Sequence, residues 1–321
     1  MVSIRHFTES DKQDVIQLFN AHCETEPLYK PWTEESFDEL FMKNPHFNPQ
    51  LAFVASQNED LIGFAFGVFV EKTRIGYITM ILVRQDVRRQ RIGSMLLTEL
   101  ENALRTLQPK QIDCSFFNPL HLTWIIPGTE GHEHPNAPGV PYPSPAYHFF
   151  RHHGYLEITT EYAYYLELKH FNIPIEIHTR IQSLNEKGIE FTFFDLEKHR
   201  FEDLFEKLGN DLWRDEIHTA VKKGLKVLVP VKDGVALGFT GPIYPQANGR
   251  GYFAGIGVHP TYQGQGIGKA LFFLPCHYEK MFGATYMSLF TGETNPARRM
   301  YESAGFTIAH SFKVMRKHFE F

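Results

Sequence analysis

The segment GYFAGIGV at residues 251–258, followed by QGQGIG at residues 263–268, decides the fold of the second half of this chain. The first half contains a matching pair, GYITMILV at residues 76–83 and RRQRIG at residues 88–93, at a constant offset of 175 (251 minus 76). Each apolar run has the length of a strand and leads through its loop into a helix-forming segment. Because the register is kept across both motifs, we interpret the chain as an internal duplication.

A second pair of motifs closes each half. NPARRMYESAGF spans residues 295–306, and SPAYHFFRHHGY spans residues 144–155. The distance from the loop glycine to the final aromatic residue is 62 residues in the first half and 38 in the second, so the first half carries 24 extra residues. Their place is the Pro/His/Gly-rich stretch at about 119–143, whose composition is typical of a loop.

The beginnings of the two halves also match. Residues 4–7 and residues 189–194 each read as a strand that leads into a capped helix. We therefore expect an N-terminal domain at 1–170, a linker at 171–188 and a C-terminal domain at 189–321.

Composition excludes several classes of protein. The 321 residues are 43% hydrophobic and 21% charged, with a formal net charge of −5, which argues against a nucleic-acid binder. The three cysteines are far apart and form no CxxC pair, so neither a disulfide framework nor a zinc finger is expected. The N-terminus has no apolar signal region, and the longest apolar run, 61–70, falls short of the roughly 18 residues that span a bilayer. We expect a cytoplasmic protein that binds no membrane.

The glycine-rich loop at 263–268 favours phosphate binding. Glycine permits a positive φ and a close approach of a ligand to the backbone, and a helix N-terminus attracts an anion. The spacing fits neither a Rossmann fingerprint nor a P-loop. A tight strand-to-helix connection without a ligand is the alternative interpretation.

Together, Q-x-x-G-x-G after an apolar strand and N-x-A-x-x-x-Y-x-x-x-G-F near the end of the domain resemble the GNAT superfamily of acyl-CoA-dependent N-acyltransferases. The whole chain resembles a tandem GNAT protein, an arrangement found in mycothiol synthase. The resemblance implies an α/β (α+β) fold with two GNAT-like domains. Each domain would have a mixed, mostly antiparallel, splayed sheet flanked by helices, with acyl-CoA in the gap. The implied reaction transfers acetyl from acetyl-CoA to an amine of a small molecule or peptide in the C-terminal domain, without a metal.

The resemblance also assigns roles to residues. Tyr301 would be the general acid that protonates the leaving thiolate, and packing against Phe306 is its alternative role. The expected acetyl-CoA contacts are Ile256, Gly257 and Val258 at the strand end, Gln263, Gly264, Gln265, Gly266, Ile267, Gly268 and Lys269 in the loop, and Asn295 beside the pantetheine arm.

The first half departs from this pattern. Arg91 replaces the glycine that matches Gly266, Phe150 replaces Tyr301 and Ser144 replaces Asn295. A side chain at 91 is expected to demand a backbone conformation compatible with Cβ. Arginines could still bind phosphate, so this half either scaffolds or forms a degenerate CoA site, without acyl transfer. The residues of such a site are Val83, Arg88, Arg89, Arg91 and Gly93.

Other assignments stay open. Glu293, His259 or ordered water could act as the general base, and Trp213, Asp215 and Glu216 could face the acceptor. His132, His134, His148 and His152 could form a zinc site, but their spacing matches no known zinc module, so no metal is expected. A non-catalytic module that senses CoA or binds a partner is the competing function.

Overall fold

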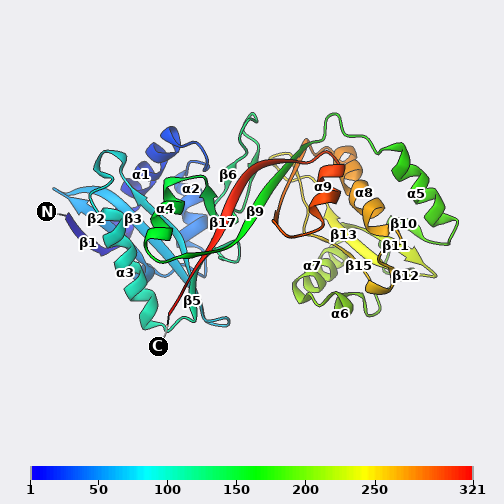
Figure 1. Ribbon diagram of the computed structural model, residues 1–321, viewed down its shortest axis with the longest axis horizontal. Coiled ribbons are helices and arrows are strands. Elements are labelled where there is room, and N and C mark those ends of the chain that lie inside the picture. The colour runs from blue at the N-terminus through cyan, green and yellow to red at the C-terminus, as the bar shows by residue number, and fades with distance from the viewer. Residues whose placement is uncertain (1, 320–321) are drawn as a thin grey trace. The chain divides into compact units, whose positions relative to one another are not determined.

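The computed structural model describes residues 2–319, which divide by their contacts into two compact units. Unit 1 comprises the described residues up to Ala163, together with Phe290–Glu293 and the residues from Ala309 onward. Unit 2 comprises Tyr164–Leu289 and Thr294–Ile308. Both units combine sheets with flanking helices, so the expected mixed α/β class is confirmed (Figure 1).

Unit 1 is built on strands that run in the order β1-β2-β3-β4-β5-β17-β9. All the pairings printed for this unit are antiparallel except the parallel pair β4–β5. The strands are β1 (Val2–His6), β2 (Ala52–Gln57), β3 (Asp60–Val70), β4 (Ile75–Val83), β5 (Gln111–Cys114), β6 (Trp124–Ile125), β7 (Glu133–His134), β8 (Val140–Tyr142), β9 (Leu156–Glu167) and β17 (Thr307–His318). The helices are α1 (Lys12–Thr25), α2 (Glu34–Phe37), α3 (Ile92–Thr106) and α4 (Pro145–His152).

Helices α1 and α3 cover opposite faces of the unit 1 sheet (Figure 1). Leucines at every fourth position of α3 form a ridge that lies against three glycines of β3 and β4. A Cβ on any of these glycines would lie only 2.9 to 3.3 Å from a leucine side chain, so the glycines let the helix approach the sheet closely. The contacting pairs are Gly63 with Leu96, Gly67 with Leu100, and Gly76 with Leu104.

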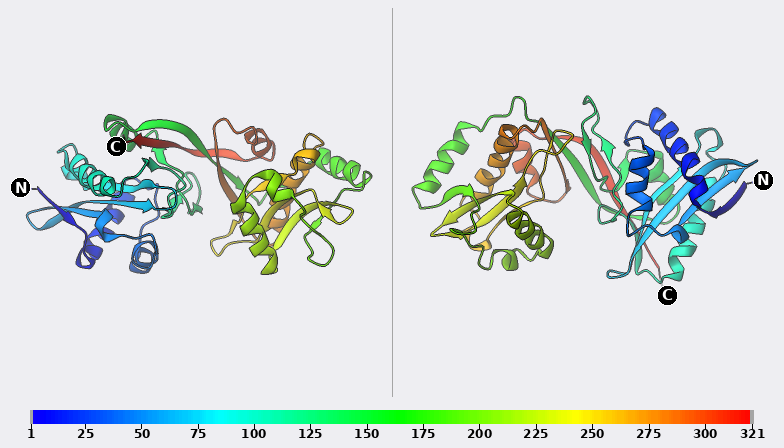
Figure 2. Two further views of the ribbon diagram at one scale, coloured as in Figure 1. Left: turned by 90° about the horizontal axis from the view of Figure 1, so that it is seen from below. Right: turned by 180° about the vertical axis from the view of Figure 1, so that it is seen from behind.

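Unit 2 repeats this plan. One sheet has the order β10-β11-β13-β15, and β14 pairs with β16 in parallel. Helix α7 covers one face of the first sheet, and α5 and α8 cover the other (Figure 2). The strands are β10 (Glu190–Phe193), β11 (Lys226–Lys232), β12 (Val235–Ala236), β13 (Gly238–Ile243), β14 (Arg250–Gly251), β15 (Ile256–Val258) and β16 (Tyr286–Gly292). The helices are α5 (Ile175–Asn185), α6 (Leu204–Leu208), α7 (Asp211–Lys222), α8 (Ile267–Met281) and α9 (Arg298–Ser303).

The duplication is visible in the strand register. Gly76 pairs with Ile112 between β4 and β5, and Gly251 pairs with Met287 between β14 and β16. Adding 175 to the first pair gives the second. In unit 1 the parallel pairing ends at Tyr77, although β4 continues to Val83. In unit 2 the strand itself is interrupted between β14 and β15. Each half therefore has the divergence of central strands that the resemblance implies.

The domain boundaries differ from the expected ones. Residues 171–188 contain α5, whose Ile181 and Leu184 pack with Ile267 and Ala270 of α8, so this segment is part of unit 2. The C-terminal strand β17 returns to unit 1, where Met315 pairs with Cys114 of β5. The inserted residues 119–143 contain the short strands β6, β7 and β8, so this segment is not the irregular loop that its composition indicates.

Candidate functional site

The strand-to-helix loops of the two halves have the same left-handed conformation at equivalent positions. Arg89 and Arg91 have φ values of 66° and 64°, and Gly264 and Gly266 have values of 76° and 85°. Arg91 therefore accommodates its Cβ within the same left-handed conformation that Gly266 adopts. Helices α3 and α8 begin directly after Arg91 and Gly266, so each loop leads into a helix N-terminus, whose free amides can bind an anion.

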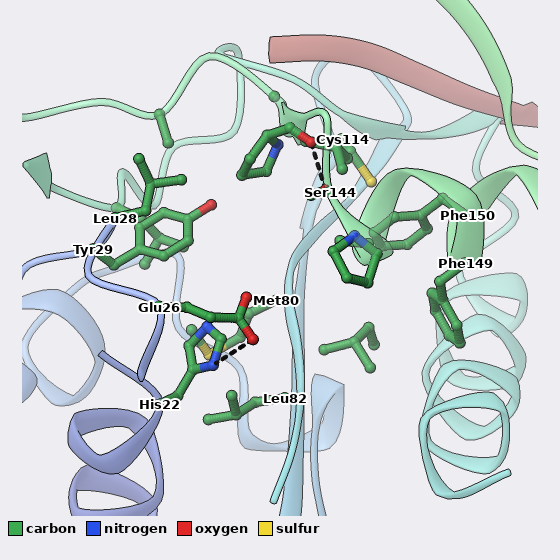
Figure 3. A pocket seen from close by; sticks show the side chains of 18 of the residues that line it. His22, Glu26, Leu28, Tyr29, Met80, Leu82, Cys114, Ser144, Phe149 and Phe150 are labelled. Atoms are coloured by element: carbon green, nitrogen blue, oxygen red, sulfur yellow. Dashed lines mark hydrogen bonds and ion pairs between the residues drawn. The ribbon is translucent and has the colours of Figure 1, made fainter. Parts of the chain in front are cut away.

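A cavity of about 1560 Å³ lies entirely within unit 1 (Figure 3). Met80 and Leu82 of β4 lie between the α1 side, marked by His22, and the α4 side, marked by Phe149 and Phe150. The lining includes all five residues expected in the degenerate CoA site, namely Val83, Arg88, Arg89, Arg91 and Gly93. The structure thus brings these residues together at one cavity.

Arg88 joins the end of β4 to the end of α1 along the cavity wall. Its Nε donates to the carbonyl of Val83 at 3.2 Å, and its Nη1 lies 2.6 Å from Glu26 Oε1. Its Nη2 lies 3.0 Å from His22 Nδ1. Burial lowers the pKa of His22, which favours the neutral imidazole beside this guanidinium. Arg88 is therefore fixed by three contacts, whereas Arg89 and Arg91 are exposed.

In unit 2, the expected cradle is covered by a side chain that the sequence motifs did not indicate. Arg180 of α5 lies against Gly266, with its Cδ and Cζ 3.1 Å from the place a Cβ would take. The side chain of Gln263 donates to the carbonyl of Val258 at 3.0 Å. A guanidinium at this loop supplies positive charge where the resemblance places a pyrophosphate.

The strand end next to this cradle is also closely packed. Ile256, Gly257 and Val258 pair with β13. A Cβ on Gly257 would lie 2.6 Å from Leu208 of α6, and one on Gly255 would lie 2.6 Å from the ring of Trp213. Glu216 accepts a hydrogen bond from the hydroxyl of Tyr252 at 2.6 Å, and Asp215 is exposed beside Arg214. Of the three expected acceptor residues, Trp213 therefore contacts the strand end directly.

Tyr301 lies on α9 and is only 6% exposed. Its ring contacts Phe272 of α8 at a centroid distance of 4.9 Å, together with Tyr164 at 5.8 Å and Phe306 at 6.4 Å. Burial raises the pKa of its phenol to about 12. Tyr301 thus packs on α8, the helix that follows the expected cradle loop. Asn295 accepts a hydrogen bond from the amide of Ala297 at 2.9 Å, just before α9.

The two side chains considered as general bases lie in different units. His259 Nδ1 accepts a hydrogen bond from the amide of Thr261, and its Nε2 lies 3.4 Å from Asp203 Oδ1 in unit 2. Glu293 belongs to unit 1, where its charge, together with burial as the larger cause, raises the pKa of Glu161 to about 7. His259 therefore lies in the loop between Val258 and Gln263, whereas the contacts of Glu293 are with unit 1 residues.

The histidines considered as zinc ligands lie in different environments. His134 is buried, with its Nδ1 2.9 Å from the carbonyl of Asn136, whereas His148 and His152 are exposed on α4. Within residues 2–319, no cluster of three or more His, Cys, Asp or Glu side chains has the geometry to hold a metal ion. No helix in that range is both long and apolar enough to cross a bilayer.

Comparison with known proteins gives the class of the chain. The sequence pattern of the Acetyltransferase (GNAT) family matches residues 15–114 and residues 191–306, once in each half. The chain belongs to the GNAT acetyltransferase family, and its two matches make it a tandem member.

Several known proteins are similar to it. A mycothiol acetyltransferase from Thermomonospora curvata is 37% identical over 78 residues, which are 24% of this chain and 26% of that protein. The glucosamine N-acetyltransferase region of a fungal multi-domain β-N-acetylglucosaminidase matches 99% of this chain at a TM-score of 0.71 and 15% identity, over 38% of its own length.

Two further solved structures align over almost their whole length. A GCN5-related N-acetyltransferase from Sphaerobacter thermophilus has a TM-score of 0.64 at 16% identity, over 99% of this chain and 95% of its own. A tandem GNAT protein from the clavulanic acid biosynthesis pathway has a TM-score of 0.58 at 14% identity, over 99% of this chain and 98% of its own. At these identities the likeness concerns the fold. The chain spans about a quarter of the curated relative and about two fifths of the fungal protein.

Proposed function

We propose that this protein transfers the acetyl group of acetyl-CoA to an amine, with the chemistry in the C-terminal half. One observation carries the choice of half: a glycine cradle at α8 and a tyrosine on the next helix, α9, occur together there, with Tyr301 packed on α8. In the first half, Phe150 takes the position of that tyrosine. The acceptor class is an amine on a small molecule or a peptide.

The reaction requires the protein to stabilise an oxyanion, bind the pyrophosphate and protonate the leaving thiolate. Amides at the strand end and the loop hold the thioester and stabilise the oxyanion that forms when the amine attacks its carbonyl carbon. The cradle at Gly266 holds the pyrophosphate, and Arg180 adds a positive charge there. Tyr301 gives its proton to the departing thiolate, and because burial raises the pKa of its phenol to about 12, the hydroxyl is protonated at neutral pH when the thiolate forms. Water takes the proton of the amine.

A second candidate places acetyl-CoA in unit 1. It is favoured by the cavity between β4 and α4 and by the left-handed conformation of Arg89 and Arg91, which reproduces the cradle of the other half. Phe150 has no proton to donate, so this site would bind the thioester without the acid that the C-terminal half possesses. The alternative of a purely CoA-sensing or partner-binding protein requires that neither half turn over any amine.

A matched pair of substitutions tests the choice of half. Gly268 and Gly93 are equivalent (93 plus 175), and each occupies the second position of its helix. Gly268→Asp and Gly93→Asp each place a carboxylate where the pyrophosphate would sit, while an acidic residue in a first helical turn stabilises the helix. Acetyl transfer from labelled acetyl-CoA is measured with a panel of amines that includes glucosamine, spermidine, phenethylamine and peptide N-termini.

We expect Gly268→Asp to raise the KM for acetyl-CoA at least about tenfold and Gly93→Asp to leave it unchanged. A raised KM for Gly93→Asp alone would indicate that acetyl transfer takes place in unit 1. If the wild-type protein binds acetyl-CoA in calorimetry but acetylates no amine in the panel, the sensor function is favoured instead.

A further inference from the structure

Helix α5 brings a guanidinium onto the loop that we propose as the cradle of the second half (Figure 1). The Cδ and Cζ atoms of Arg180 lie 3.1 Å from the place that a Cβ on Gly266 would take, and its Nη1 lies closer still. The helix is docked on α8, because Ile181 and Leu184 pack with Ile267. The position of Arg180 therefore follows from the packing of α5 and not from the sequence of the loop.

Helix α5 lies outside the part of the second half that matches the GNAT family. The match begins at residue 191, whereas the helix ends at Asn185. The resemblance therefore assigns no role to Arg180, and its role follows from its surroundings in this chain.

The guanidinium of Arg180 has no hydrogen-bond acceptor or ion-pair partner within residues 2–319. Glu176 lies four residues earlier on α5, at the spacing that lets a glutamate and an arginine pair on a helix surface. The two side chains make no ion pair, and the arginine extends to Gly266 instead. Its N–H donors are thus available to a ligand at the loop.

The charges around this loop favour an anion. Helix α8 begins at Ile267, directly after Gly266, and a helix N-terminus carries a partial positive charge. The first turn of α8 contains Lys269 and no acidic residue. Arg180 adds a further positive charge at the same end of the helix, where a cation alone is unfavourable. A bound anion offsets this accumulation of positive charge.

The first half also has an arginine at this point of its loop. Arg91 is the counterpart of Gly266 and has nearly the same φ and ψ values. Its Cβ takes the place that, beside Gly266, is filled by the side chain of Arg180. The two halves thus position an arginine at the same loop by different routes, one from the loop itself and one from α5.

We propose that Arg180 is a donor-specificity residue of the second half, whose guanidinium pairs with the pyrophosphate of the acyl-CoA donor. The inference rests on the proposed function and adds to it a residue that selects donors with a pyrophosphate over thioesters that lack one. The loop amides are neutral donors, whereas a guanidinium brings a full charge and two parallel N–H groups that match phosphate oxygens.

Three ligands separate the phosphates of the donor from the rest of the molecule. CoA has a pyrophosphate and a 3′-phosphate, dephospho-CoA has only the pyrophosphate, and pantetheine has neither. Calorimetry measures the Kd of the first two on full-length Gly93→Asp protein, in which the first-half loop is blocked. The Kd of pantetheine is taken from its competition with CoA.

We expect Arg180→Ala to raise the Kd of CoA and of dephospho-CoA about tenfold each and to leave the Kd of pantetheine unchanged. Arg180→Lys keeps the charge without the planar fork and should raise the first two by a smaller factor, about threefold. Lys187→Ala is the matched control, because it removes the same charge from an exposed position just after α5, and it should change none of the three.

An unchanged Kd of CoA in Arg180→Ala would overturn the inference. An increase for CoA without one for dephospho-CoA would also overturn it, because the guanidinium would then contact the 3′-phosphate. An equal increase for pantetheine would mean that Arg180 only supports the loop. If the Gly93→Asp parent binds no CoA, the proposed function fails as well. If Gly268→Asp raises the Kd of CoA and Arg180→Ala does not, only the role of Arg180 fails.

Discussion

Arg91 and Gly266, which are 175 residues apart, occupy the same position before equivalent helices with nearly the same backbone. Arg91 has φ 64° and ψ 5°, and Gly266 has φ 85° and ψ 3°. A left-handed conformation costs an L-residue roughly 1–2 kcal/mol, and such strain clusters at functional loops. The first half therefore has the same loop backbone as the cradle that we propose at Gly266, although an arginine stands in place of the glycine.

The strain at Arg91 predicts a gain in stability on replacement by glycine. Arg91→Gly removes the Cβ that makes the left-handed conformation unfavourable, and we expect the free energy of unfolding to rise by about 1 kcal/mol. Arg91→Ala is the matched control, because it removes the guanidinium but keeps the Cβ, and it should bring no gain. Urea unfolding of the three proteins measures the difference. Equal gains in both variants would show that the charge of Arg91, and not its backbone conformation, destabilises the folded protein.

The converse substitution tests the cradle of the C-terminal half. Gly266→Arg should fold, because Arg91 already adopts this conformation, but its side chain would enter the space that Arg180 occupies. We expect calorimetry to show a Kd for acetyl-CoA that is at least about tenfold higher, which is about 1.4 kcal/mol. Gly283→Arg is the control, since Gly283 also has a positive φ and no neighbour within 4 Å. An unchanged Kd for Gly266→Arg would remove this loop from the proposed site.

The sequence predicts the repeat well because the two halves share short-range patterns. The offset of 175 found in the motifs reappears in the pairing of Gly76 with Ile112 and of Gly251 with Met287. Loop glycines and strand-to-helix transitions are local features, so their spacing in the chain translates directly into structure. For the same reason, the five residues expected at a degenerate first-half site do line one cavity.

The remaining features depend on contacts between residues that are distant in sequence. Nothing in the pattern of residues 307–318 indicates that this strand pairs with β5, about 200 residues earlier, and thereby places His310 at the unit 1 cavity. The position of Arg180 over Gly266 likewise follows from the packing of α5 on α8. A linker is expected there because the periodicity is weak, yet three apolar positions, Ile177, Ile181 and Leu184, are enough to dock the helix.

Glu279 gives a pH-dependent prediction. Its side chain is fully buried, one oxygen accepts the amide of Tyr244 at 2.9 Å, and the other has no partner among the described residues. Burial raises its pKa from 4.5 to about 8. The folded protein therefore holds a proton that the unfolded chain loses, and stability decreases as the pH rises from about 4.5 to 8.

Glu279→Gln removes this dependence. We expect the variant to match the wild type near pH 4 and to be more stable above pH 8 by roughly 3 to 5 kcal/mol. Urea unfolding across this range measures the difference, and Glu176→Gln on the exposed face of α5 is the control. A difference that does not change with pH would mean that Glu279 is charged in the folded protein throughout this range.

The last prediction concerns the proton that the leaving thiolate needs. Tyr301→Phe keeps the ring contacts with Phe272, Tyr164 and Phe306 and removes only the hydroxyl, so the fold and the affinity for acetyl-CoA should persist. A positioned acid contributes about 10²- to 10⁴-fold in rate, and we expect kcat to fall by roughly 10²-fold. Steady-state kinetics with an amine that the wild type acetylates measures this ratio.

The matched control is Phe150→Tyr, which gives the first half the missing hydroxyl. It should change kcat little if the C-terminal half performs the transfer, because Arg91 and Ser144 still differ from their counterparts. A phenol whose pKa is raised to about 12 by burial holds its proton at neutral pH, as an acid must. If Tyr301→Phe turns over like the wild type, Tyr301 only packs α9 against α8. Another group, or water, would then protonate the thiolate. If kcat rises in Phe150→Tyr and is unchanged in Tyr301→Phe, acetyl transfer takes place at the cavity of unit 1.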